Sequence, residues 1–260
     1  MTYKSLTFSV DGHAATITLN RPDVFNALND EITFELQDAL EEVAVDENVR
    51  VVVLTGSGKA FCSGQDLKGI ASQTNLSYKE SVEKRYNPII KAMRGMPKPI
   101  LCKLNGVAAG AGCSIALACD LIIASEEAWL SLAFINIGLV PDSGASYFTP
   151  RLVSMSKAFE LCVMGSKISA GEALQLGMIN KVVLHDQLDP TIRSYVDHFS
   201  NAPTKAIGII KQMLQKSGTS TLTEMLEYEA LSQEIAGHTF DHAEGVRAFL
   251  EKRKPAFKGR

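Results

Sequence analysis

The sequence predicts an α/β protein with a strand-rich core in front and helices behind. Two observations predict this class. Unbroken apolar runs typical of strands buried on both faces occur at 51–54, 100–104 and 121–124, with helical patterns between them. Beyond residue 132, most segments have the apolar period of helices. With 260 residues, 46% of them hydrophobic, the chain can form one large domain or a core with an appendage.

The first elements are two strands and a helix. Residues 6–10 and 14–19 alternate between apolar and polar, and the dipeptide Asp11-Gly12 between them predicts a hairpin, because glycine readily adopts positive φ. Residues 30–43 have the spacing of an amphipathic helix. The pattern then recurs, with strands at 51–54, 100–104, 121–124 and 129–132 and helices at about 78–93 and after Gly112.

The remainder is predicted to be mainly helical. We place a boundary near residue 200, which divides the chain into a core (residues 1–200) and a C-terminal helical region (residues 201–260). No linker rich in Ser or Gly separates them, which indicates that the helices pack on the core or on another subunit. Helical patterns cover 145–153, 156–164, 171–176, 189–199, 203–216, 222–236 and 242–252, and one strand-like stretch lies at 181–184.

Composition excludes several classes of protein. The net charge of −3, from 26 basic and 29 acidic residues, argues against nonspecific nucleic-acid binding, which needs a basic surface. No apolar window is long enough to span a membrane, and the N-terminus lacks a signal core. The five cysteines form no C-x-x-C pair, so we expect buried, reduced thiols in a cytoplasmic protein and no metal site.

The first candidate loop covers residues 56–67 and follows a buried strand. Its Gly58-Lys59 pair suggests a phosphate loop, but Val53 and Ala60 stand where that loop needs Gly and Ser or Thr. ATP binding is therefore rejected. What remains is a Gly-rich turn whose backbone N–H groups can point at a ligand.

The second candidate loop covers residues 105–114 and leads into a helix. Its Gly110-Ala111-Gly112 triplet lacks the third glycine of a dinucleotide site, because residue 115 is Ile. Residues 112–116 are nearly a nucleophile elbow around Ser114, and Asp142 followed by His198 or His238 would complete the order of a serine hydrolase. Alternatively, Ser114 caps a helix and the small residues allow close packing.

The third candidate loop covers residues 137–144. Asp142 stands just before a predicted helix, where it could serve as an N-cap that accepts backbone N–H bonds. Taken alone, this position favours the cap; the alternative, suggested by the apolar neighbours along the chain, is a desolvated carboxylate whose raised pKa suits proton transfer.

Four motifs stand in order along the chain. They are Arg21-Pro22 with Asn26-Ala27-Leu28, residues 60–67, Asn105-Gly106 with residues 110–112, and residues 137–142. With these motifs the sequence resembles the crotonase (enoyl-CoA hydratase/isomerase) family over nearly the whole chain. Residues 86–88 and 138–142 are most similar to the branch that isomerises 1,2-epoxyphenylacetyl-CoA.

The resemblance implies a crotonase-like spiral of ββα units with a C-terminal helical trimerisation region, assembled as a homotrimer or hexamer. It implies an acyl-CoA thioester substrate whose enolate is held by the backbone N–H groups of Gln65 and Ala111. Coenzyme A is then part of the substrate, and no separate cofactor is expected. Positions matched to substrate or CoA binding are Ala27, Asp66, Leu67, Lys68, Gly110, Ser114 and Phe134.

The resemblance also favours one reaction. Hydratases of the family use two glutamates, whose positions here hold Ser114 and Phe134, so hydration is the weaker alternative. Double-bond isomerases of the family carry an aspartate at the position of Asp142. A single base can move a proton from one carbon to another, so we expect isomerisation of a 3-enoyl-CoA or of a ring epoxide of phenylacetyl-CoA.

Overall fold

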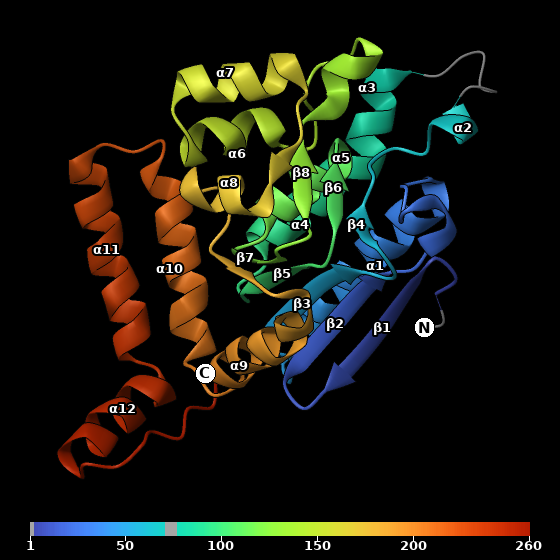
Figure 1. Ribbon diagram of the computed structural model, residues 1–260. Helices are drawn as coiled ribbons and strands as arrows, with labels where there is room; N and C mark the ends of the chain where they lie inside the picture. Colours follow the sequence, from blue (N-terminus) through green and yellow to red (C-terminus); the bar gives the residue numbers. More distant parts are fainter. Residues whose placement is uncertain (1–2, 71–76) are drawn as a thin grey trace.

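A computed structural model describes residues 3–70 and 77–260. Their strands form two sheets (Figure 1). The larger sheet has the order β1 (Leu6–Asp11), β2 (Ala14–Leu19), β3 (Val51–Gly56), β5 (Ile100–Leu104), β7 (Leu121–Ser125) and β10 (Lys181–Val183). The smaller sheet has the order β4 (Ala60–Cys62), β6 (Val107–Ala109), β8 (Trp129–Ser131) and β9 (Ile168–Ser169).

Successive turns of the chain repeat one pattern. A strand of the larger sheet leads into a strand of the smaller sheet and then into a helix, as in β5, β6 and α5 (Ala111–Ala118). The pairs β3–β5, β5–β7, β4–β6 and β6–β8 are all parallel, as expected when each return passes through a helix. This arrangement confirms the predicted α/β spiral of ββα units.

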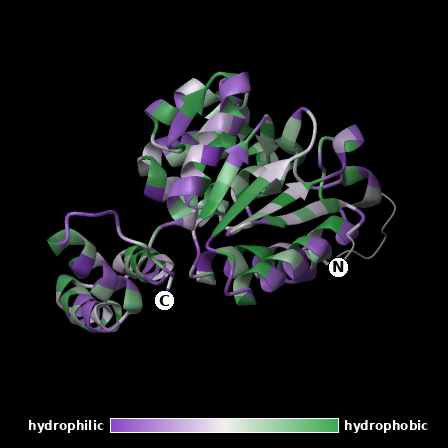
Figure 2. Ribbon diagram, turned by 90° about the horizontal axis from the view of Figure 1, so that it is seen from below, coloured by the Kyte–Doolittle hydropathy of each residue, from purple (hydrophilic) through white to green (hydrophobic). Residues whose placement is uncertain are grey.

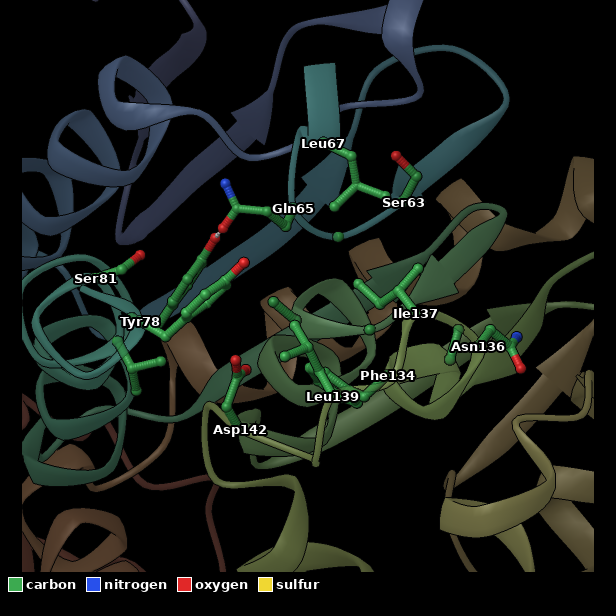
Figure 3. A pocket seen from close by; sticks show the side chains of 16 residues that line it. Ser63, Gln65, Leu67, Tyr78, Ser81, Phe134, Asn136, Ile137, Leu139 and Asp142 are labelled. Atoms are coloured by element: carbon green, nitrogen blue, oxygen red, sulfur yellow. Dashed lines mark hydrogen bonds between the residues drawn. The ribbon is translucent and has the colours of Figure 1, made fainter. Parts of the chain in front are cut away.

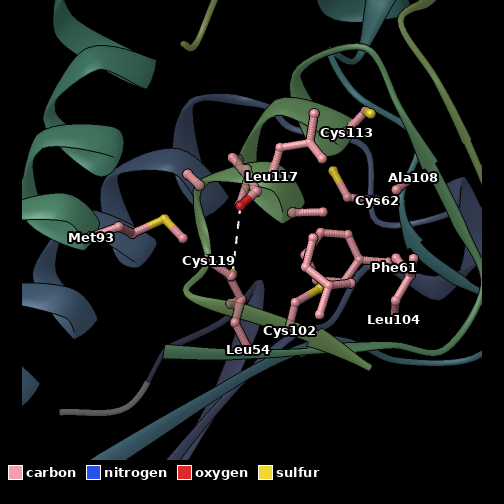
Figure 4. Packing of buried hydrophobic residues seen from close by; sticks show 14 of the residues in the cluster. Leu54, Phe61, Cys62, Met93, Cys102, Leu104, Ala108, Cys113, Leu117 and Cys119 are labelled. Atoms are coloured by element: carbon pink, nitrogen blue, oxygen red, sulfur yellow. Dashed lines mark hydrogen bonds between the residues drawn. The ribbon is translucent and has the colours of Figure 1, made fainter. Parts of the chain in front are cut away.

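The main core lies between the larger sheet and helices α1 (Asp30–Val45), α4 (Asn87–Gly95) and α5. The Asn29 side chain begins α1 by accepting the Ile32 N–H at 3.1 Å. Phe61 is fully buried near Cys102 and Leu104 (Figure 4). Burying a side chain of this size contributes about 1.5–3 kcal/mol, and the cysteines packed around it act as small apolar groups.

Two differences from the sequence prediction concern the segments around the pocket described below. The first two loops contain the strands β4 and β6, which are too short for their alternation to stand out in the sequence. The predicted helix at 78–93 consists of α3 (Tyr78–Ser81), a π-helical segment (Val82–Tyr86) and α4. The wider π-turn breaks the 3.6-residue period at a point where several side chains line a pocket.

The C-terminal part is helical, as predicted. Helix α9 (Leu188–Ser200) packs on strands of the larger sheet. Helices α10 (Thr204–Ser217), α11 (Leu222–Gly237) and α12 (Phe240–Leu250) extend away from the sheets (Figure 1). The end of α9 at Ser200 coincides with the proposed boundary, and the division into two units remains a prediction. Ahead of these helices in the chain lie α6 (Ala145–Leu152), α7 (Met155–Met164) and α8 (Ala170–Gln175).

Helix α10 is attached to the core by a buried cation. The Lys211 ammonium donates to the carbonyl of Met93 at 2.8 Å and to the carboxylate of Asp120 at 2.7 Å, and Asp120 also pairs with Arg94 at 2.9 Å.

Among the helices that the structure describes, none combines the length and apolar character needed to cross a bilayer.

Candidate active site

The first loop turns sharply at Gly64, which has φ +90°, a conformation that favours glycine. A Cβ on Gly64 would lie 2.7 Å from the Ala109 carbonyl oxygen and 3.5 Å from the Ala111 nitrogen, so the first two loops are in close contact. The turn is fixed because the Leu28 N–H donates to the Gly64 carbonyl at 2.8 Å and the Asp66 N–H donates to the Leu28 carbonyl at 2.9 Å.

The second loop ends where α5 begins. Gly110 has φ +52° and donates its N–H to the Ser131 carbonyl at 3.0 Å, and Ala111 is the first residue of the helix. Gly112 packs so closely on β4 that a Cβ there would lie 2.3 Å from the Cys62 carbonyl oxygen. The first N–H groups of a helix have no intrahelical acceptor and carry partial positive charge.

Two backbone amides are therefore available at the contact between these loops. In the part of the chain that the structure covers, neither the Gln65 nor the Ala111 N–H donates to another protein group. Both residues line one pocket. Two fixed donors beside a pocket can stabilise an oxyanion that develops between them, because they need no reorientation when the charge forms.

The pocket has a volume of about 470 Å³, within the usual range for sites that bind small molecules (Figure 3). Its wall comes from the first two loops, from α3 and the π-helical segment, from the 3₁₀ helix Ala133–Ile137, and from the third loop. The lining is Ser63, Gly64, Gln65, Leu67, Tyr78, Ser81, Val82, Tyr86, Gly110, Ala111, Ala133, Phe134, Asn136, Ile137, Leu139 and Asp142.

Asp142 supplies the one carboxylate among these described lining residues. Its carboxyl group points into the pocket (Figure 3) and accepts a hydrogen bond from the Ser143 hydroxyl at 2.8 Å. Burial raises the pKa of Asp142, and the Ser143 hydrogen bond opposes part of that rise. The N-cap alternative is wrong, since α6 is preceded by Gly144 and has no side-chain cap.

Tyr86 is a polar group of the pocket that sequence reasoning did not identify as functional. It is only 3% exposed and donates its hydroxyl to the Gln65 side-chain oxygen. Burial and the nearby charge of Asp142 raise the pKa of Tyr86, so its phenol stays protonated. The Gln65 side-chain nitrogen in turn donates to the Leu28 carbonyl at 3.3 Å, so Tyr86 braces the loop that carries the first amide.

Ser114 does not line the pocket, and the serine-hydrolase alternative is wrong. The residue is fully buried in α5, and its hydroxyl donates to the carbonyls of Gly110 at 3.3 Å and Asp142 at 3.0 Å. Its partners are thus backbone oxygens and not an imidazole that could activate it. Ser114 instead connects the second loop to the third.

The other residues matched to substrate or CoA binding separate into two groups. Leu67, Gly110 and Phe134 line the pocket. Asp66 forms an ion pair with Arg21 at 3.0 Å, and a second Arg21 nitrogen donates to the carbonyl of Ala27, which is buried. Asp66 and Ala27 therefore act together in bracing the first loop, and Lys68 is exposed outside the pocket lining.

The described residues offer no cluster of three or more His, Cys, Asp or Glu side chains that could bind a metal ion. Among the polar groups of the described pocket lining are the backbone amides of Gln65 and Ala111, the carboxylate of Asp142 and the buried phenol of Tyr86. Together with the ββα spiral, this pocket is typical of an α/β enzyme that binds a small molecule. Comparisons with known proteins identify the family.

A sequence model of the enoyl-CoA hydratase/isomerase family matches residues 11–260, and the chain belongs to this family. It is 39% identical over 258 residues to the 1,2-epoxyphenylacetyl-CoA isomerase of Escherichia coli K12, covering 96% of this chain and 97% of that protein. It is 35% identical to the (E)-benzylidenesuccinyl-CoA hydratase of Thauera aromatica, covering 98% and 99%. These matches confirm the resemblance seen in the three loops.

Solved structures support the same assignment. The crystal structure of an enoyl-CoA hydratase from Bacillus anthracis superposes with a TM-score of 0.94 at 32% identity, covering 99% of this chain and all of that one. One from Mycobacterium smegmatis gives a TM-score of 0.92 at 33% identity, covering 97% and 98%. The whole fold of this chain, C-terminal helices included, is thus that of the family.

Proposed function

We propose that this protein is an acyl-CoA isomerase that moves a proton with one base, Asp142. The observation that carries the proposal is the pairing of a single carboxylate with two unoccupied amides across one apolar pocket. Burial favours the neutral form of Asp142, which suits a group that must both accept a proton and return it.

The chemistry follows from these positions. With a 3-enoyl-CoA, Asp142 removes a proton from C2, and the electron pair moves onto the thioester oxygen. The N–H groups of Gln65 and Ala111 donate to that oxygen, and the positive end of α5 adds to the stabilisation. Asp142 then returns the proton to C4, which leaves the double bond between C2 and C3. No atoms are gained or lost.

Hydration is less well supported by the pocket. Addition of water requires a group that activates the water and a group that supplies the second proton. The side chains at the two positions matched to the hydratase glutamates are the buried hydroxyl of Ser114 and the phenyl ring of Phe134. Neither can act as a general base, and the described lining offers no second carboxylate.

Two substrates are candidates, a 3-enoyl-CoA and a ring epoxide of phenylacetyl-CoA. The second is supported by the activity named for the relative from Escherichia coli. Aromatic and aliphatic side chains such as Phe134, Leu139 and Val82 line the pocket and suit an apolar acyl group. We further propose a cytoplasmic homotrimer or hexamer that takes coenzyme A only as part of its substrate.

The test is the variant Asp142→Asn, assayed with 3-hexenoyl-CoA for isomerisation and with 2-hexenoyl-CoA for hydration. Loss of the carboxylate that acts as the base should lower the isomerisation rate by about 10²–10⁴-fold. Asp23→Asn, which changes an exposed carboxylate outside the pocket, is the matched control and should retain full activity. An Asp142→Asn enzyme that isomerises at the wild-type rate, or a wild type that only hydrates, contradicts the proposal.

A further inference from the structure

The residue after Asp142 has a conformation that its side chain does not favour. The Ala145 N–H donates to the Asp142 carbonyl at 3.0 Å, which closes a four-residue turn over residues 142–145. Its two central residues both have positive φ, +53° at Ser143 and +83° at Gly144 with ψ 0°. These angles match a type I′ turn, in which Asn, Asp or Gly is preferred at the first central position.

Serine at that position requires an explanation. A left-handed conformation is strained for a residue with a Cβ, and Ser143 is only 2% exposed, so solvation of its hydroxyl does not offset the strain. The hydroxyl makes one hydrogen bond, to Oδ1 of Asp142 at 2.8 Å. The strained backbone of Ser143 thus places its hydroxyl against the carboxylate of Asp142.

The backbone of Asp142 does not depend on this hydroxyl. Its carbonyl already accepts from the Ala145 N–H and from the Ser114 hydroxyl, each at 3.0 Å. These two bonds fix where the side chain leaves the main chain. What they leave undetermined is rotation of the carboxyl group, and the Ser143 hydroxyl is the group placed to restrict that rotation.

We propose that Ser143 is a positioning residue that holds Oδ1 of Asp142 and thereby presents Oδ2 as the atom that carries the proton. The inference rests on the proposed function. In the isomerisation, the C2–H bond breaks and an O–H bond forms at Oδ2, then the O–H bond breaks and a C4–H bond forms. Because the Ser143 hydroxyl holds Oδ1, the carboxyl group always presents Oδ2 to the substrate.

The hydroxyl also stabilises the ionised carboxylate, because it donates to the charged form. The titratable group that responds to the charge of Asp142 is the Tyr86 phenol, which remains protonated through the physiological range. Removing the Ser143 hydroxyl should therefore move the acidic limb of the pH profile of kcat to higher pH.

The experiment compares Ser143→Ala, Ser143→Gly and Ser143→Asn with the wild type, using 3-hexenoyl-CoA. Ala keeps the strained position without the hydroxyl, Gly removes both the strain and the hydroxyl, and Asn suits the turn and carries an N–H donor. We expect kcat to fall by about tenfold in the Ala and Gly variants, with little change in KM and the acidic limb at higher pH. The Asn variant should recover part of the rate.

Thermal unfolding separates this role from a structural one. Ser143→Gly should be more stable than Ser143→Ala and yet equally impaired. A Gly variant with the wild-type kcat and pH profile overturns the inference, because the hydroxyl would then serve only the turn. If Asp142→Asn is inactive while all three variants match the wild type, the positioning role alone is wrong. If Asp142→Asn is active, the proposed function itself fails.

Discussion

At the level of single residues, the chemistry proposed for Asp142 implies a cost in stability. Its folded-state pKa is raised by burial, so the folded protein binds a proton more tightly than the unfolded chain. Below the unfolded-state pKa both states are protonated and nothing is lost. As the pH rises through the raised folded-state pKa, the buried charge forms and the free energy of unfolding falls.

This cost can be measured with Asp142→Asn, whose side chain has a similar shape and never ionises. We expect the variant to be more stable than the wild type at pH 7.5, and the gain to shrink as the pH approaches 4.5. Thermal unfolding at several pH values provides the measurement. A difference in Tm that does not change with pH would show that burial of the charge is not its cause.

At the level of elements, the beginning of α5 is predicted to supply an oxyanion donor through the Ala111 N–H. Proline is accepted at the first position of a helix, where the N–H has no intrahelical partner. Ala111→Pro therefore removes the donor with little effect on the helix. The loss should lower kcat by about 10²–10³-fold.

Ala111→Gly is the matched control, because it keeps the N–H group and takes away only the methyl group of a residue that is 3% exposed. Circular dichroism and thermal unfolding establish that both variants retain the fold. An Ala111→Pro enzyme with the activity of Ala111→Gly would exclude this amide from the oxyanion site.

Elements also show where sequence reasoning works and where it stops. The larger sheet could be predicted because buried parallel strands are unbroken apolar runs, and the Gly64 and Gly110 turns because glycines mark sharp changes of direction. Two kinds of element could not be predicted, the three-residue strands β4 and β6 and the π-helical segment Val82–Tyr86. They depend on contacts between segments that are distant in the sequence. The pairing of β4 with β6 brings together the two loops that carry the Gln65 and Ala111 amides.

The same limit applied to side chains of the site. The position of Asp142 before a helix suggested both a cap and a catalytic carboxylate, and only the structure showed that it faces the pocket. Ser114 looked like a nucleophile within its local sequence, yet its hydroxyl is occupied by the carbonyl of Asp142, 28 residues away. Partners far apart in sequence decide such roles, and a local pattern contains no information about them.

At the level of the whole molecule, the C-terminal helices are attached to the core but incompletely covered. Seen from below, the C-terminal helices project from the body, and hydrophobic residues recur along them (Figure 2). On α11, Leu222 and Leu231 are nine residues apart, which is two and a half helical turns and places them on opposite faces. Both are exposed, at 75% and 64%.

A helix with apolar residues on opposite faces is normally buried. In α11, Ser232 is the buried residue, so the described part of this chain does not supply the burial expected from the composition of the helix. Large exposed apolar surfaces of this kind mark interaction sites. In the proposed homotrimer or hexamer, neighbouring subunits would bury these apolar side chains. Leu214, Phe249 and Leu250 on the adjacent helices are exposed apolar residues that the same contact would cover.

The double variant Leu231→Lys/Ile235→Lys tests this assembly. Both side chains are exposed in the single chain, so the fold should change little, whereas two charges buried at an interface should separate the subunits. Light scattering coupled to gel filtration should give three or six chains for the wild type and fewer for the variant. Gln233→Lys, which adds a charge at an exposed polar position of the same helix, is the control and should leave the assembly intact. A wild type that exists as single chains, or a double variant with an unchanged mass, would remove α11 from the interface.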